Sequence, residues 1–219
     1  MNQSPSIVVA VSGASGSVYV LRLLQVLLQA RHRVDLIVSD AGRQVLQQES
    51  GSTFPAESAA EVEWRQFIAA GPVPNLTGWS AVDVSLLVGQ LHIHGLRDFS
   101  AGVASGSFQT QGMVVCPCST GTLSALATGA STNLIHRAAD VHLKERRKLI
   151  LVPRETPLSR ITLANMLTVT DAGAVVLPAM PGFYHQPDGV EDLVDFVVGR
   201  ICDQLQIDHR LSRRWGGEQ

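Results

Sequence analysis

Short apolar runs recur along this chain, and they constrain its fold more than any other feature of the sequence. They are rich in β-branched residues and lack polar alternation, which is typical of parallel strands covered on both faces. We expect strands at Ile7–Val11, Val34–Val38, Met113–Cys116, Leu149–Val152 and Ala174–Leu177. Helical periodicity predicts helices at Val18–Gln29, Ala41–Glu49, Thr120–Ala127, Ile135–Arg147, Arg160–Thr170 and Val190–Leu205. The alternation of strand and helix predicts an α/β fold, a three-layer, doubly wound parallel sheet of the Rossmann-like or flavodoxin-like type.

A single domain accounts for nearly the whole chain, because 219 residues suffice for one full hydrophobic core. We expect this domain to span residues 1–208, and residues 209–219 to form a polar tail that is either frayed or docked on a neighbouring subunit. The least regular part is residues 51–100, where we expect an insertion or lid that includes one more strand at Val82–Val88.

Composition excludes several classes of function. The formal net charge of −2 removes the basic footprint of a nucleic-acid-binding protein. Hydrophobic residues make up 45% of the chain and charged residues 16%, which favours a globular protein with part of its surface buried in an oligomer. No apolar run reaches the length of a membrane span, and no signal peptide is expected. Three cysteines, Cys116, Cys118 and Cys202, are an odd count, so we expect reduced structural thiols in the cytoplasm.

Two turns rich in glycine and hydroxyl residues follow two of the predicted strands. Ser12–Gly16 follows the first strand and opens a helix, where backbone N–H groups and the helix dipole favour a phosphate. Ser119–Thr122 follows the third strand in the same way, and Ala104–Phe108 is a third, less specific turn. The first turn matches neither a full dinucleotide-binding fingerprint nor a Walker A loop. An ordinary glycine-rich turn and a simple helix cap remain open as interpretations of these segments.

Cations gather around the later strands. Arg137 and Lys144 are seven residues apart on one predicted helix face, where they are either solvated or directed at a ligand. Arg154 and Glu155 end a buried strand between two prolines. A fork-shaped arginine suits a phosphate and the carboxyl group suits proton transfer, although a plain ion pair would explain both residues. Tyr184, after the last strand, offers a phenol to a phosphate.

No metal site is expected. His92 and His94 lack a third ligand, and Asp192 with Asp195 is only half of a magnesium–diphosphate motif. The two aspartates are better explained as the polar face of an amphipathic helix.

Taken together, these segments resemble the UbiX-type flavin prenyltransferases, and the resemblance covers nearly the whole chain. It rests on Ser39 and Glu49 and on the segments SGASG, ASGSF, GMVVCPCSTGTL, NLIHRAADVHLKERR, LVPRETPL, PAMPGFYHQP, VEDLVDFVVGRI and the final RW. The resemblance implies FMN as the bound flavin and a homododecamer with the flavin at subunit contacts. It also implies that dimethylallyl phosphate alkylates N5 of reduced FMN and that a second bond to C6 closes a ring. The prenylated FMN would then serve a UbiD-type decarboxylase, and no metal would be required.

The resemblance also assigns roles by motif position. Ser15, Glu49, Lys144 and Glu155 would be catalytic, with the two glutamates handling protons. The substrate phosphate would be held by Lys144, Arg154, Tyr184 and Arg200. FMN would contact Gly13, Ala14, Ser15, Ser39, Ser119, Thr120, Gly121, Thr122 and Arg137.

The sequence departs from the family pattern at Val20, at ITLANML and in the length of residues 76–97. Two other functions remain open. An FMN-dependent cysteine decarboxylase of the same fold family would show Pro-x-Met-Asn after the last strand, but Pro181 follows Met180 here. In a non-enzymatic flavin carrier, the set Lys144, Arg154, Glu155 and Tyr184 would be superfluous.

Overall fold

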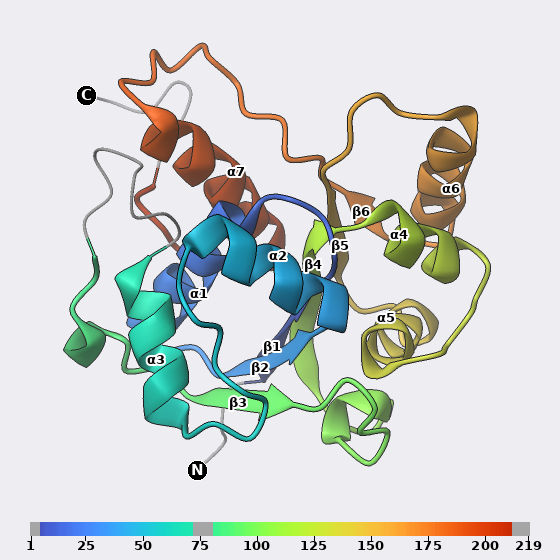
Figure 1. The fold of residues 1–219 in the computed structure, drawn as a ribbon. Helices are drawn as coiled ribbons and strands as arrows, with labels where there is room; N and C mark the ends of the chain where they lie inside the picture. Colours follow the sequence, from blue (N-terminus) through green and yellow to red (C-terminus); the bar gives the residue numbers. More distant parts are fainter. Residues whose placement is uncertain (1–4, 72–80, 212–219) are drawn as a thin grey trace.

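A computed structural model describes residues 5–71 and 81–211, and it contains one parallel sheet of six strands (Figure 1). The spatial order of the strands is β3-β2-β1-β4-β5-β6. This is the Rossmann order, and it confirms the predicted doubly wound sheet. The strands are β1 Ser6–Val11, β2 Val34–Val38, β3 Leu91–His94, β4 Thr110–Cys118, β5 Leu149–Pro153 and β6 Val175–Val176.

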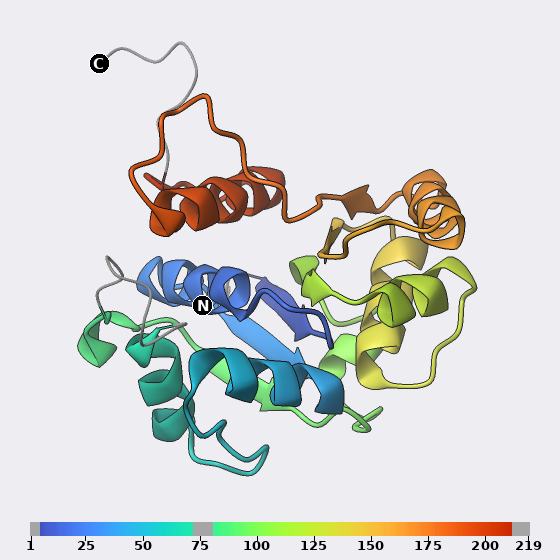
Figure 2. The same cartoon turned by 45° about the horizontal axis from the view of Figure 1, so that its top comes forward.

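Helices cover both faces of the sheet. One layer holds α1, α2, α3 and α7, and the other holds α4, α5 and α6 (Figure 2). Among the helices that the structure describes, none combines the length and apolar character needed to span a membrane. The helices are α1 Ser17–Gln29, α2 Asp40–Ser50, α3 Glu61–Ala70, α4 Thr120–Ala127, α5 Leu134–Lys144, α6 Arg160–Asp171 and α7 Val190–Leu205.

The sheet explains why the strand sequences lack polar alternation. Along β1, Val9 and Val11 pack into the layer of α1 and α7, whereas Val8 and Ala10 pack into the layer of α4 and α5. Successive side chains of a strand point to opposite faces, and here both faces are buried. Every residue of β1 is therefore buried.

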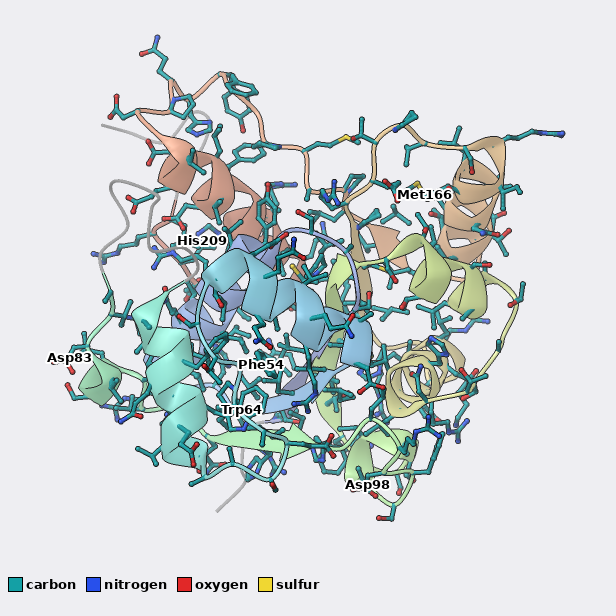
Figure 3. All side chains as sticks on the ribbon, in the orientation of Figure 1. Phe54, Trp64, Asp83, Asp98, Met166 and His209 are labelled. Carbon is teal, nitrogen blue, oxygen red and sulfur yellow. The ribbon has the colours of Figure 1, made fainter. Side chains whose placement is uncertain are left out.

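The region from 51 to 100 differs from the expectation. It contains α3, which was not predicted, and α3 buries Trp64 to 1% exposure against the edge of Phe54, with ring centroids 4.9 Å apart (Figure 3). The strand predicted at Val82–Val88 is wrong, since a 3-10 turn lies at Val84–Leu86 and the strand is β3. This part of the chain therefore completes the core and is not an insertion or lid. Residues 72–80 lie outside the described residues.

Only the start of the predicted tail is described. The His209 Nε2 lies 3.1 Å from Asp203 Oδ1, and Leu211 packs on the main core (Figure 3). Residues 209–211 therefore dock on their own domain beside α7, while 212–219 lie outside the described residues. The domain boundary at residue 208 stays a prediction.

A hydroxyl-lined site at the carboxyl edge of the sheet

The connections that leave β1, β2 and β4 lie together at the switch point of the sheet, between β1 and β4, where the strand order reverses. From β1 the chain continues towards β2 and β3 on one side, and β4, β5 and β6 lie on the other. In open α/β sheets, ligands bind at this switch point, outside the carboxyl ends of the strands. The turns that leave β1, β2 and β4 begin at Ser12, Ser39 and Ser119, so two of the three predicted hydroxyl turns gather at one edge with Ser39. The third, Ala104–Phe108, precedes β4 and so lies at the other end of that strand.

Two of these serines cap helices. The Ser39 Oγ accepts the Gly42 N–H at 3.0 Å at the start of α2, and the Ser119 Oγ accepts the Thr122 N–H at 3.2 Å at the start of α4. The capping interpretation is thus confirmed, and it leaves room for a ligand. The backbone N–H groups of Thr120 and Gly121 lie in the first turn of α4, where a helix provides no acceptor of its own.

The start of α1 is occupied by a side chain of the protein itself. Glu49, at the end of α2, accepts the backbone N–H of Gly16 at 3.1 Å and that of Ser17 at 2.7 Å. It also accepts the Ser17 hydroxyl at 2.6 Å. The prediction of N–H groups free for a phosphate is therefore wrong for Gly16 and Ser17, because the carboxylate takes both. The sequence could not predict this contact, since Gly16 and Glu49 are 33 residues apart.

Hydrogen bonding determines the charge state of Glu49. Burial acts to raise the pKa of this carboxyl group, but hydrogen bonds from Ser15, Ser17 and Gly16 outweigh burial and hold the pKa below its ordinary value. Glu49 is therefore an anion near neutral pH, placed where the positive end of the α1 dipole favours it.

Gly13 permits close packing within this edge. A Cβ atom added at Gly13 would lie 2.5 Å from the Cβ of Ala41 in α2, which is closer than two carbon atoms can approach. Ala14 is nearly buried, whereas Ser15 is exposed. The β1–α1 turn is therefore pressed against α2, with the Ser15 side chain at the surface.

Arg154 joins the same edge from β5. Its Nε donates to the Ser15 carbonyl at 3.1 Å, across 139 residues of sequence. The neighbouring Glu155 is exposed and accepts the Thr156 N–H at 3.0 Å. Within the described residues the two side chains form no ion pair, so the plain ion-pair interpretation is wrong. The guanidinium stands beside the β1–α1 turn.

Two predicted site residues lie elsewhere in this chain. The Arg137 Nε donates to the Ala104 carbonyl at 3.0 Å, and its Nη1 pairs with Asp140 at 2.7 Å. Lys144 is exposed and pairs with Glu145 at the end of α5, next to the amino end of β5. Arg154 follows the other end of that five-residue strand, which is about 13 Å long. One chain therefore does not bring Lys144 to Arg154.

Tyr184 and Arg200 share one side of α7. The Tyr184 ring packs edge-on against Phe196, with centroids 5.7 Å apart, and Arg200 is one turn further along the same helix face. Arg200 pairs with Asp203 at 2.9 Å. His185 stacks flat on Phe196 at 5.3 Å. Phe196 and His185 were not predicted, although the spacing of Phe196 and Arg200 was a usable signal.

The remaining sequence candidates are structural. Asp195 pairs with Arg22 of α1 at 2.7 Å, as expected of a polar helix face. Burial raises the pKa of Cys118 to about 12 and that of Cys116 further, so both are unreactive thiols. Over residues 5–71 and 81–211, no group of three or more potential metal ligands is found.

The fold and this edge define a class of protein, a single-domain α/β flavoprotein. The family model described as "Flavoprotein" matches residues 1–202. The flavin prenyltransferase UbiX of Pseudomonas aeruginosa is 48% identical over 217 residues, which are 99% of this chain and 96% of the relative. The chain belongs to the flavin prenyltransferase UbiX family.

Solved structures agree. AnUbiX (PadA1), in complex with FMN and dimethylallyl pyrophosphate, is 37% identical with a TM-score of 0.78, covering 98% of this chain and 99% of that one. A dodecameric FMN-dependent UbiX-like decarboxylase from Escherichia coli O157:H7 is 37% identical with a TM-score of 0.77, covering 97% of this chain and all of that one. The cysteine decarboxylase TvaF, at 16% identity and a TM-score of 0.51, shares the fold alone.

Proposed function

We propose that this protein joins the dimethylallyl group of dimethylallyl phosphate to N5 and C6 of reduced FMN, giving prenylated FMN. The observation that carries the proposal is the convergence of the turns after β1, β2 and β4 with Arg154 at the switch point of the sheet. Membership of the UbiX family supports it. The contrast with TvaF, which shares only the fold, argues against the cysteine decarboxylase alternative.

The residues at this edge fit a flavin mononucleotide. Ser39 and the Ser119–Thr122 turn present hydroxyls, and Thr120 and Gly121 add backbone N–H groups at the start of α4. We place the FMN phosphate there and not at α1, whose first N–H groups are bound to Glu49. The Gly13–Ser15 turn would line the flavin ring. Bound reduced FMN would supply the nucleophilic N5 and C6 and a π system that tolerates an allylic cation.

Fixed cations would stabilise the departing phosphate. Arg154 stands at the carboxyl edge, and Tyr184 with Arg200 offers a donor and a charge from the side of α7. With Lys144, three cations offset a monophosphate dianion without a metal. The monophosphate should therefore be a better substrate than the diphosphate, although AnUbiX is seen with the latter.

Lys144 and Arg137 would reach this site from another copy of the chain. Within one chain Arg137 is bound to Asp140 and to the Ala104 carbonyl, and Lys144 is bound to Glu145. Exposed apolar side chains on α6 (Ile161, Leu163 and Leu167) would be covered in the same assembly. We propose a homo-oligomer, with the dodecamer of the E. coli relative as the expected form.

Proton transfer is assigned to Glu155, with Ser15 orienting flavin N5. Glu155 is exposed beside Arg154, so it is accessible to a substrate, whereas Glu49 is saturated with hydrogen bonds. We assign Glu49 chiefly to holding the β1–α1 turn. The product would pass to a UbiD-type decarboxylase. The three buried free thiols fit a cytoplasmic location.

Incubation with reduced FMN and dimethylallyl phosphate, followed by mass spectrometry of the released flavin, tests the proposal. We expect a flavin heavier by one dimethylallyl group less the hydrogen that it replaces, formed equally well in excess EDTA. An active UbiX relative, assayed in parallel, is the positive control. If the relative modifies FMN and this protein leaves it unmodified after prolonged incubation, prenyl transfer is refuted. Activity lost in EDTA and restored by magnesium would refute the metal-free phosphate site.

A further inference from the structure

Ser12 connects two turns that lie far apart in sequence. It follows the last residue of β1, and its side chain is 1% exposed. Its hydroxyl donates to the Pro117 carbonyl at 3.0 Å and accepts the Ser119 N–H at 2.8 Å. Its own N–H donates to the same Pro117 carbonyl at 3.2 Å. All three hydrogen bonds cross to the carboxyl end of β4, two of them to Pro117 within the strand and one to Ser119 just after it, more than a hundred residues along the chain.

These bonds begin where the sheet ladder stops. The paired residues of β1 and β4 end at Ala10 and Val115, so the ladder no longer sets the spacing beyond them. Beyond these pairs, Ser12 joins the end of β1 to the last residues of β4 and to the turn that follows β4. Because the hydroxyl is buried and its one donor hydrogen is already used by the protein, Ser12 contacts the two turns and not a ligand.

Each partner of Ser12 in turn holds part of the edge. Ser119 is the N-cap of α4, so the residue whose N–H is fixed by Ser12 also sets the first turn of that helix. On the other side, the Ala14 N–H donates to the Ser12 carbonyl at 2.8 Å, which closes the Gly13–Ala14 turn. Ser12 therefore sits between the two turns assigned to FMN.

We propose that Ser12 is a positioning residue for the flavin: it fixes the distance between the Gly13–Ser15 turn and the Ser119–Thr122 turn without touching the ligand. The proposal rests on the FMN site of the proposed function. Leaving a buried donor or acceptor without its partner costs free energy. Loss of the Ser12 hydroxyl would leave the Pro117 carbonyl and the Ser119 N–H with one partner fewer, and both turns would lose their fixed position.

The test compares Ser12→Ala with Ile201→Val, a control that removes one buried methylene from α7 away from this edge. Amide hydrogen exchange is measured first, without flavin. We expect exchange to accelerate about tenfold in residues 13–16 and 117–122 of Ser12→Ala only. The Kd for FMN, followed by flavin fluorescence, should rise about tenfold in the same variant, and the circular dichroism of the bound flavin should change.

Unchanged exchange in both turns of Ser12→Ala would overturn the proposal, and so would equal losses of FMN affinity in the two variants. If Ser12→Ala does not fold, Ser12→Cys replaces it under the same criteria, since a thiol fills the space but bonds weakly. A wild-type protein without affinity for FMN would instead refute the proposed function, while the exchange data would still decide whether Ser12 couples the turns.

Discussion

The two ends of the sheet use similar polar residues in opposite ways. At the amino end, polar groups are buried and paired within the protein. His142 is fully buried between the Ala138 carbonyl at 2.7 Å and the Thr110 hydroxyl at 2.8 Å. Buried Asp35, near the start of β2, binds His94, the last residue of β3, at 2.7 Å. At the carboxyl edge, hydroxyls cap helices but stay partly accessible, as for Ser39 and Ser119.

This difference separates residues that hold the fold from residues that are available to a ligand. Most polar groups enclosed in a protein are hydrogen-bonded within it, as both ring nitrogens of His142 are, so little remains for another molecule. At the carboxyl edge the backbone N–H groups at the start of α4 have no acceptor of their own. Lys144 is the exception in this comparison, because it is assigned to the substrate phosphate at the carboxyl edge but lies near the amino end of β5.

The largest expected effect concerns Lys144 and Arg154. We expect Lys144→Ala and Arg154→Ala each to lose prenyl transfer by roughly 30- to 5,000-fold while still binding FMN, because removing one charge-assisted contact in a buried site costs about 2–5 kcal/mol. Turnover of dimethylallyl phosphate and flavin titration measure the two effects.

Mixed assemblies then test where Lys144 acts. Oligomers refolded from both variants together should regain activity, because some sites would combine an intact Arg154 with an intact Lys144 from another copy. Arg160→Ala, an exposed cation at the start of α6, is the control and should stay near wild-type activity. Mixed oligomers as inactive as their parents would place Lys144 in the site of its own chain.

The second prediction concerns stability at the amino end. Burial lowers the pKa of His142 from its ordinary 6.5 to about 4, so the unfolded chain takes up a proton that the folded chain refuses. The free energy of unfolding should be unaffected by this group above pH 6.5. It should fall by about 1.4 kcal/mol per pH unit as the pH drops from there towards 4.

His142→Gln removes the titrating group and keeps hydrogen-bonding capacity. Urea unfolding of both proteins at several pH values should therefore show a steeper acid loss in the wild type. Parallel pH profiles for the two proteins would mean that His142 is not held neutral by burial.

A smaller effect is expected at Tyr184. Tyr184→Phe and Phe196→Leu should each raise the KM for dimethylallyl phosphate about five- to tenfold, because the first removes the phenol and the second removes the ring that positions it. In a double variant the effects should not add, since Phe196 acts through Tyr184.

Phe183→Leu is the matched control. Phe183 is 68% exposed, and within the described residues its ring contacts no other ring. It should keep a wild-type KM. Strictly additive effects of the Tyr184 and Phe196 substitutions would show that Phe196 acts independently of the phenol.

The smallest effect is expected for Glu49→Gln. Hydrogen bonds hold the pKa of Glu49 below its ordinary value despite burial, so its stabilisation is present above pH 4.5 and is lost as the pH falls through the lower folded value. The variant should lose about 0.5–1 kcal/mol of unfolding free energy at neutral pH, and the difference should shrink in acid.

Glu63→Gln provides the comparison, because Glu63 bonds the Ala60 N–H at the start of α3 in the same manner, away from the site. Thermal unfolding should show a small loss in both variants, whereas only Glu49→Gln should weaken FMN binding. Equal FMN affinity in the two variants would separate Glu49 from the flavin site.

Residue pattern alone was sufficient for the strands other than β3 and for most helices, because a strand buried on both faces has an apolar signature that needs no partner to be recognised. It failed at β3, where His92 and His94 interrupt the pattern. In the folded chain His94 forms a hydrogen bond with Asp35, and this bond makes a polar residue compatible with the edge strand. α3 was not predicted because its apolar residues, Trp64, Phe67 and Ile68, are recognisable as one buried face only when Phe54 and the core that they pack against are known.

By itself the sequence determined the fold class, the hydroxyl turns and the cations, since these follow from local periodicity and residue type. The tertiary structure decided which of them meet. In the folded chain Glu49 binds the N–H groups at the start of α1, and Arg154 donates to the Ser15 carbonyl. The Ser12 hydroxyl accepts the Ser119 N–H, and Lys144 lies at the end of β5 opposite Arg154. Hydrogen bonds join residues that are close in space, and closeness between distant segments is set by strand order and packing, which no local pattern records.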